Sequence, residues 1–421
     1  MKLSSRVSLI KPSATMAVAE RASALRAQGV DLIDFGAGEP DFDTPEPIKD
    51  AAAEAMRNGA TKYTPVGGTD ALKTAIVTKL QRDNGLTYDK REVMASCGGK
   101  HSLFVAFQAL FGPGDEVIIP APFWVSYPDM LMLAGAESRF VRTTAASGFK
   151  VSPEALEAAI TPRTKAVIPV YLAGKPVDMD RLYAIANKHK LRVIEDAAQA
   201  IGSTWKGKPI GSFGDFVSFS FQANKNITTS EGGCLVLNNE AEATLAEKYR
   251  LQGVTRSGWD GIEVDVLGGK YNMTDIAAAI GLGQFAKLND ITAQRRKLAK
   301  HYFKTLGKDF EKQTGAQLPP EEFTNTNWHL FQIVLPERIT RADFMAKMKE
   351  QHNIGIGFHY APIHLFKLYR ARGFKEGMFP VAERVGKQII SLPMFYAMNE
   401  SDVERTCKAM REVLAVSPNS R

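Results

Sequence analysis

Cysteine is scarce in this 421-residue chain, which contains only Cys97, Cys234 and Cys407. An odd number without any Cys-x-x-Cys spacing argues against a disulfide framework and a zinc cluster, and it favours a reducing compartment. No metal site is predicted. No window approaches the roughly 18 consecutive apolar residues that suggest a membrane span, and Met1–Val7 lacks the apolar core of a signal peptide. We therefore expect a cytoplasmic protein without membrane contact.

Long basic runs are absent as well, although the net charge is +7 and the pI is near 9.1. Lysine and arginine are scattered among aspartate and glutamate, so we expect a generic basic surface and no nucleic-acid partner. A modest positive field would instead attract phosphorylated or nucleotide-linked small molecules. The sequence also shows no internal repeat and no low-complexity tract.

Apolar β-type runs alternate with helical stretches from about residue 46 to about residue 290. The strand candidates are Val117–Pro120, Ala166–Val170, Arg192–Glu195, Phe216–Phe221 and Cys234–Leu237. The helix candidates are His101–Phe111, Pro153–Ile160, Asp180–Lys188 and Glu240–Leu251. This alternation predicts an α/β fold with a mostly parallel sheet that is covered on both faces.

Two domains are expected at this length. We predict a large domain over residues 46–290 and a smaller α+β domain formed by residues 1–45 and 291–421. A long amphipathic helix over residues 286–306 would link them. The smaller domain would contain a helix over residues 14–29, a strand over Trp328–Leu335, and helices over Arg341–Glu350 and Glu400–Leu414.

The segment Val193–Gly233 delivers an acid, Asp196, after one β-type run and an amine, Lys225, shortly after the next. In parallel α/β sheets, ligands bind outside the carboxyl ends of the strands. An acid and an amine there suit pyridoxal phosphate, because lysine forms a Schiff base with it and an acid keeps its pyridine nitrogen protonated. Gln199 lies about one helical turn after Asp196, and Ser220 precedes Lys225 by five residues.

Each of these residues also has a simpler interpretation. Aspartate at position 196 would be a common helix N-cap, and lysine is usually a solvated surface residue. Their joint placement at the ends of adjacent β-type runs is harder to explain by structural roles alone.

The first half of the sheet region offers a phosphate site and an aromatic platform. Cys97-Gly98-Gly99-Lys100 lies between a β-type stretch and a predicted helix, where backbone N–H groups and the helix dipole favour an anion. Trp124 follows the strand Val117–Pro120 and would stack on a flat ring. A plain strand–helix turn and a buried aromatic core are the alternatives.

Residues from about 160 to 415 resemble the DegT/DnrJ/EryC1/StrS family of pyridoxal phosphate-dependent sugar aminotransferases. The matching segments are Thr161–Val170, Gly174–Asp180, Glu195–Ala200, Gly211–Asp215, the Lys225 segment, Tyr271–Asp275 and His359–His364. The resemblance implies a fold-type-I transferase with a mostly parallel, seven-stranded-type sheet, acting as a homodimer. It also implies Lys225 as the Schiff-base lysine, Asp196 on the pyridine nitrogen, Gln199 on the ring hydroxyl, Ser220 on the phosphate and Asn272 on the phosphate of the neighbouring subunit.

Residues 1 to about 145 are similar to class I aminotransferases of the aspartate type. The matching segments are Gly38–Pro45, Lys62–Pro65, Gly98–Lys100, Pro113–Pro120 and Trp124–Pro128. This resemblance implies Gly38 near the substrate carboxylate, Tyr63 on the partner subunit's phosphate, Gly99 and Lys100 as backbone phosphate donors, and Trp124 stacked on the ring. The class I Asn-Pro-x-Gly and Ser-x-Ser-Lys motifs are absent, and Cys97–Lys100 replaces the Ser-Gly-Thr turn of the sugar enzymes.

The sequence therefore predicts an aminotransferase that moves an amino group from glutamate or glutamine to a keto-sugar joined to a nucleotide, in a ping-pong reaction. An amino acid:2-oxo acid aminotransferase is the first alternative. A non-catalytic pyridoxal phosphate-binding regulator or an inactive hybrid is an alternative of another class. The related sugar dehydratases would have histidine at position 225, where this chain has Lys225.

Overall fold

The computed structural model describes residues 28, 44–60, 65, 67–124, 126–144, 148–214, 216–257, 261–366, 369–370 and 373–415. Within them the chain divides into two compact units. The larger unit contains the described residues from 44 to 296 and the segment Glu322–His329, and the smaller contains residue 28, Lys297–Glu321 and the chain from Leu330 onward. The helix expected over residues 14–29 lies almost wholly outside the described residues, so the predicted domain boundaries stay a prediction.

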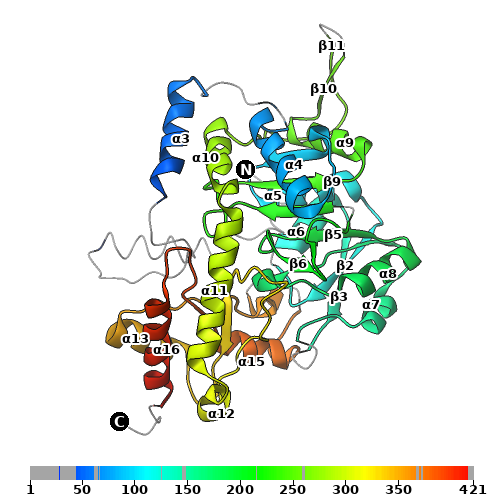
Figure 1. The fold of residues 1–421 in the computed structure, drawn as a ribbon. Coiled ribbons are helices and arrows are strands. Elements are labelled where there is room, and N and C mark those ends of the chain that lie inside the picture. Colours follow the sequence, from blue (N-terminus) through cyan, green and yellow to red (C-terminus); the bar gives the residue numbers. More distant parts are fainter. Residues whose placement is uncertain are drawn as a thin grey trace. The chain divides into compact units, whose positions relative to one another are not determined.

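A seven-stranded sheet forms the centre of the larger unit (Figure 1). Its strands lie in the order β1, β9, β8, β5, β4, β2, β3. Their bounds are β1 Val93–Ser96, β2 Glu116–Ala121, β3 Glu137–Arg142, β4 Thr164–Val167, β5 Arg192–Asp196, β8 Phe216–Ser220 and β9 Gly233–Leu237. All neighbouring pairs are parallel except those of β9, which runs antiparallel to both β1 and β8. The predicted α/β class with a mostly parallel sheet is confirmed.

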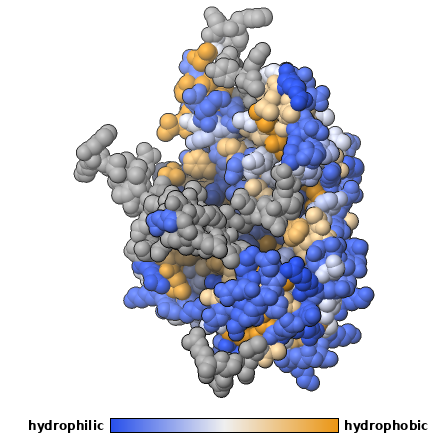
Figure 2. All heavy atoms as spheres, turned by 90° about the vertical axis from the view of Figure 1, so that its left-hand side faces the viewer, coloured by the Kyte–Doolittle hydropathy of each residue, from blue (hydrophilic) through white to orange (hydrophobic). Residues whose placement is uncertain are grey.

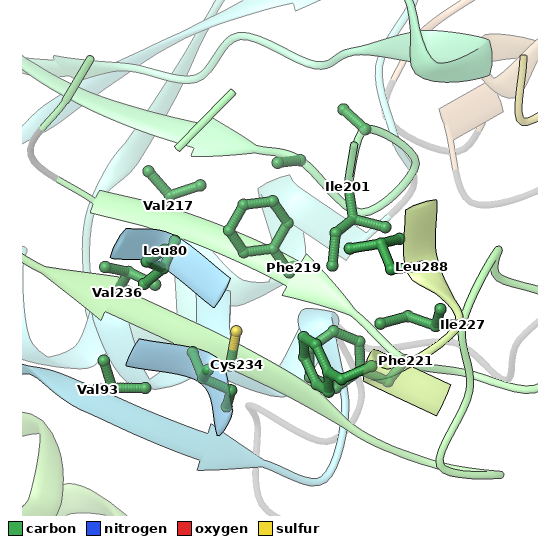
Figure 3. Close-up of a cluster of buried hydrophobic side chains, with 14 of the residues drawn as sticks. Leu80, Val93, Ile201, Val217, Phe219, Phe221, Ile227, Cys234, Val236 and Leu288 are labelled. Carbon is green, nitrogen blue, oxygen red and sulfur yellow. The ribbon is translucent and has the colours of Figure 1, made fainter. Parts of the chain in front are cut away.

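The sheet separates hydrophobic clusters because successive strand residues point to opposite faces. Phe216 of β8 packs in a cluster with side chains of α5, α6 and α9, whereas Val217 and Phe219 pack in another with α4 and α10. Figure 3 shows the second cluster, where Leu80 and Leu288 join the strand side chains. A third cluster packs α7 and α8 on β2 to β5. Strands buried on both faces explain the continuous apolar runs of the sequence.

Several helices of the larger unit begin or end at residues with clear capping roles. Thr69 accepts a hydrogen bond from the Leu72 N–H at the start of α4, and Gly85 ends that helix with φ +64°. Asp178 caps α8 by accepting from the Arg181 N–H. The bounds are α3 Glu46–Arg57, α4 Asp70–Asn84, α5 Gly99–Leu110, α6 Ser126–Ala134, α7 Pro153–Ala159, α8 Met179–His189, α9 Glu240–Arg250, α10 Asp275–Phe285 and α11 Leu288–Leu306, with 3₁₀ turns η1 Lys90–Glu92 and η2 Leu172–Gly174.

Two hairpins complete the larger unit. They are β6–β7 (Thr204–Trp205, Lys208–Pro209) and β10–β11 (Val254–Ser257, Gly261–Val264). The second hairpin projects from the rest of the unit (Figure 1). The smaller unit contains an antiparallel pair, β12 with β13, and several helices. Their bounds are α12 Phe310–Thr314, β12 Phe331–Val334, α13 Arg341–His352, η3 Ile363–Leu365, α15 Pro380–Gln388, β13 Ile389–Leu392 and α16 Glu400–Ala415.

Two expected strands are shorter than the sequence indicated. β4 ends at Val167, because Pro169 has no N–H to donate to a neighbouring strand, and only an isolated bridge joins Val170 to Asp196. The strand expected from Trp328 begins at Phe331, because Trp328 has a left-handed backbone with φ +51°.

Hydrophilic residues cover much of the face drawn in Figure 2, with hydrophobic patches between them. Among the described residues, no helix is long and apolar enough to cross a membrane.

A buried leucine of the central sheet provides a test of this packing. Leu235 of β9 is 0% exposed, so we expect Leu235→Ala to lower the free energy of unfolding by about 2–5 kcal/mol through lost burial and a residual cavity. Leu267 is 89% exposed, and Leu267→Ala should change it by no more than about 0.5 kcal/mol. Urea denaturation followed by circular dichroism measures both. Equal effects of the two substitutions would contradict the assigned core.

Candidate active site

Asp196 is a buried carboxylate at the carboxyl end of β5. Its Oδ2 accepts a hydrogen bond from the hydroxyl of Tyr127, and its Oδ1 accepts one from the Ala198 N–H at 2.9 Å. Burial raises the pKa of Asp196, while the two donors and the charge of Lys225 act in the opposite direction. The carboxylate is therefore held by specific donors in a site that water scarcely reaches, as a buried charge requires.

Lys225 lies in the loop that follows β8. The loop is folded back onto the strand end, because the Thr229 N–H donates to Phe221 O at 2.8 Å and the Lys225 N–H donates to Gln222 O at 3.0 Å. Burial lowers the pKa of the Lys225 ammonium, the Asp196 carboxylate raises it, and Lys100 lowers it. A lowered pKa increases the fraction of neutral amine, which is the nucleophilic form.

The amino end of α5 forms a cradle beside Ser220. Gly98 precedes the helix with φ +145°, and no side chain caps the first turn. A methyl group on Gly99 would lie 3.0 Å from Cβ of Ser220 and 3.2 Å from the carbonyl oxygen of Phe219. The backbone at Gly99 therefore approaches β8 more closely than it could if a residue with a side chain stood at position 99. Uncapped N–H groups at a helix start bind anions.

Two further predicted residues lie at the ends of neighbouring elements. Lys100 is exposed, and its Nζ lies 5.6 Å from the ring centroid of Trp124, a cation–π contact. Trp124 follows β2, which places it at the same edge of the sheet as Asp196 and Ser220. Its stacking on a cofactor ring stays a prediction.

Gln199 is oriented by a turn that the sequence did not predict. Its Oε1 accepts a hydrogen bond from the Ala173 N–H at 2.6 Å, and Ala173 adopts a left-handed conformation with φ +58° inside η2. Asn327 holds the same segment, because its Nδ2 donates to Gln199 O at 2.9 Å and to Ile201 O at 2.8 Å.

Several residues that support the site were missed by sequence reasoning. Tyr127 belongs to the segment Trp124–Pro128, in which the sequence predicts a role for Trp124 alone. Glu195 is fully buried and accepts hydrogen bonds from the hydroxyls of Tyr171 at 2.7 Å and Tyr183 at 2.6 Å. His329 Nδ1 lies 2.8 Å from Oδ1 of Asn226, and Asn226 directly follows Lys225 in the chain. The acidic pair Glu195–Asp196 was a visible signal, but the tyrosines that bind it are distant in sequence.

The roles of three predicted residues are not tested by the described structure. Asn272 lies between β11 and α10 and accepts a hydrogen bond from Lys270 Nζ at 2.6 Å. Gly38 and Tyr63 lie outside the described residues. Their roles, two of which involve a neighbouring subunit, stay predictions. Among the residues that the structure describes, no group of three or more His, Cys, Asp or Glu side chains is arranged to hold a metal ion.

The cluster suits a ligand with a basic ring nitrogen, an aldehyde and a phosphate. Asp196 supplies a buried carboxylate, and Lys225 supplies an amine of lowered pKa. Gly98 and Gly99 form a cradle, which a Cβ at position 99 would narrow. These three features match the three functional groups of pyridoxal phosphate.

Comparison with known proteins agrees with this chemistry. The profile of the DegT/DnrJ/EryC1/StrS aminotransferase family matches residues 78–411. The spore coat polysaccharide biosynthesis protein SpsC of Bacillus subtilis (strain 168) is 34% identical over 354 residues, which cover 77% of this chain and 88% of SpsC.

Solved structures are similar over nearly the whole chain. The PLP form of the putative sugar aminotransferase Spr1654 from Streptococcus pneumoniae has a TM-score of 0.77 and 26% identity, covering 91% of this chain and 98% of that one. DesV of S. venezuelae has a TM-score of 0.76 and 26% identity, covering 95% and 97%.

The family match begins at residue 78, and therefore includes Cys97–Lys100 and Trp124. It reaches further toward the amino terminus than the motifs from residue 160 onward indicated. The chain belongs to the DegT/DnrJ/EryC1/StrS aminotransferase family.

Proposed function

We propose that this chain transfers an amino group from glutamate or glutamine to a keto-sugar joined to a nucleotide, in a ping-pong reaction with pyridoxal phosphate. The observation that carries the proposal is the electrostatic pairing of Asp196, after β5, with Lys225, after the adjacent β8. Membership of an aminotransferase family and likeness to Spr1654, a putative sugar aminotransferase, support it.

Pyridoxal phosphate, when bound, supplies an electron-withdrawing ring that stabilises negative charge on the substrate carbon. Asp196 keeps a proton on the ring nitrogen, because a carboxylate favours a positive charge nearby. The Lys225 amine would take the proton from the carbon that bears the donor's amino group and would then act as the acid that returns it. The mixed influences on its pKa suit a group that must both accept and release a proton.

The phosphate group would be held by the cradle at α5. The backbone N–H groups of Gly98, Gly99 and Lys100 and the hydroxyl of Ser220 would bind its oxygens, which carry a charge of about −1.5 to −2. Tyr63 and Asn272 would add contacts from the neighbouring subunit of a homodimer.

A keto-sugar acceptor is favoured over a 2-oxo acid. The class I motifs Asn-Pro-x-Gly and Ser-x-Ser-Lys are absent from the chain, as is the usual arginine context for a substrate carboxylate. The net charge of +7 suits a substrate that carries phosphates. An amino acid:2-oxo acid aminotransferase is the second candidate because of the aspartate-type motifs before residue 145.

Replacing Lys225 tests the central assignment. We expect Lys225→Ala to abolish the visible absorption band of cofactor joined to lysine and to lower kcat by at least about 10²–10⁴-fold, because the proton carrier is lost. Lys165→Ala is the matched control, since Lys165 is an exposed lysine of β4. Absorption spectra and single-turnover rates measure both. A band that survives in Lys225→Ala would remove Lys225 from its role.

Replacing Tyr127 tests the support of Asp196. Tyr127→Phe removes a donor to the carboxylate, so the pKa of Asp196 should rise further, because a hydrogen bond that favours the ionised form is lost. The reaction needs the ionised carboxylate, which is lost as the pH falls through this pKa. The acidic limb of the kcat profile should therefore move to higher pH. An unchanged limb would show that Tyr127 does not stabilise this charge.

A substrate screen separates the two candidate reactions. Purified protein should convert glutamate or glutamine together with nucleotide-linked keto-sugars, and it should react slowly with aspartate and 2-oxoglutarate. Stopped-flow absorbance that follows the cofactor through each half-reaction measures this. Rapid transamination of 2-oxoglutarate with aspartate, and none with keto-sugar nucleotides, would select the second candidate.

A further inference from the structure

Arg250, the last residue of α9, is a buried cation outside the cluster described above. Its side chain is 0% exposed, and its Nε, Nη1 and Nη2 have no hydrogen-bond partner among the described residues. Burial lowers its pKa to about 10, which leaves it charged at neutral pH. A buried charge without hydrogen bonds is costly, so a bound group that satisfies it would be strongly favoured.

His101 supplies a second unpartnered group at the same place. Its Nε2 is buried without a hydrogen-bond partner among the residues described, while its Nδ1 lies 2.9 Å from the Cys97 sulfur. The His101 ring packs edge-on against Tyr271 at 4.3 Å, and the Tyr271 N–H donates to Arg250 O at 3.1 Å. Tyr271 thus brings α5 and the end of α9 together.

The protonation states make all of these groups donors. Burial raises the pKa of the Cys97 thiol, so the thiol keeps its proton and is able to donate it in the hydrogen bond with Nδ1 of His101. Burial and the charge of Arg250 lower the pKa of His101 to about 4, so its ring is neutral. With Nδ1 accepting, the single ring proton lies on Nε2. Arg250 and His101 both present N–H groups, and a guanidinium has no acceptor.

Charged side chains of both signs surround Arg250. Lys73 lies near Arg250, and burial lowers its pKa while Glu247 raises it and Arg250 lowers it. Glu247 raises the pKa of Arg250 through space but makes no hydrogen bond with it among the described residues. Asp70 and Asp89 also raise the pKa of Lys73, so Arg250 is the charge here that lacks a hydrogen-bonded partner among the described residues.

We propose that Arg250 and Nε2 of His101 bind a phosphate-type oxyanion between the end of α9 and the first turn of α5. The planar guanidinium matches two phosphate oxygens, and a tetrahedral group offers a further oxygen to His101. The phosphate has two possible sources. One is a free or substrate-borne phosphate. The other is the cofactor, whose cradle begins at Gly98, directly after Cys97, and this second source rests on the proposed function.

The first arm of the test uses the holoenzyme and inorganic phosphate. At constant ionic strength, phosphate in place of chloride should raise the wild-type melting temperature by a few degrees, because a ligand that binds only the folded state stabilises it. Arg250→Met keeps the side-chain length without the charge and should lose the effect. Arg250→Lys should retain part of it, because lysine lacks the planar fork.

The second arm compares pyridoxal phosphate with pyridoxal, which lacks the phosphate. If the cofactor is the source, inorganic phosphate does not shift the melting temperature of the holoenzyme. Arg250→Met should then lower the affinity for pyridoxal phosphate by about 10- to 100-fold and leave the affinity for pyridoxal unchanged. His101→Phe keeps the ring contact with Tyr271 and should lower the affinity for pyridoxal phosphate severalfold. If Arg250→Met does not fold, His101→Phe and Arg250→Lys still test the proposal.

The proposal is wrong if neither phosphate source distinguishes these variants from wild type. Failure of the proposed function would look different. In that case wild-type protein would show no visible cofactor band, while the inorganic phosphate arm, carried out on the protein as purified, would still report on Arg250.

Discussion

The site depends on the cost of placing charged groups where water scarcely reaches. Asp196 is buried at the end of β5, and its carboxylate is stabilised by Tyr127, by the Ala198 N–H and by the charge of Lys225. Each partner comes from a different segment: Tyr127 from α6, Ala198 from the turn after β5, and Lys225 from the loop after β8. These three segments therefore meet at one electrostatic requirement, the stabilisation of the buried Asp196 carboxylate.

The loops around Asp196 are held by hydrogen bonds as well as by the apolar packing of Ala197 and Ile201. Asn327 is fully buried, and its N–H donates to Oγ of Ser203, whose hydroxyl donates in turn to Gly174 O. These contacts keep η2, the turn after β5 and the segment Glu322–His329 in one position. A loop so restrained can present Gln199 in one orientation, which is what recognition of a flat ring requires.

The sequence was sufficient for the parts of the fold that local patterns determine. The alternation of apolar runs and helices predicted the parallel sheet, and the charged residues after two of its strands predicted where Asp196 and Lys225 lie. The contacts that support them were not predictable from local patterns, because they join distant residues. Tyr127 lies 69 positions from Asp196, and Asn327 lies 128 positions from Gln199. Trp328 was assigned to a strand because its left-handed backbone leaves no local signal.

The antiparallel strand β9 has a consequence for the order in which the molecule acquires its binding capacity. β9 lies between β1 and β8, and Ser218 donates to the carbonyl of Gly99, 119 residues earlier in the chain. The phosphate cradle is thus complete only after segments far apart in sequence have met, a step that loop-closure entropy makes slow. Cofactor binding should accordingly follow the formation of the central sheet. During refolding, the visible absorption band of the cofactor would therefore appear only in molecules whose central sheet has already formed.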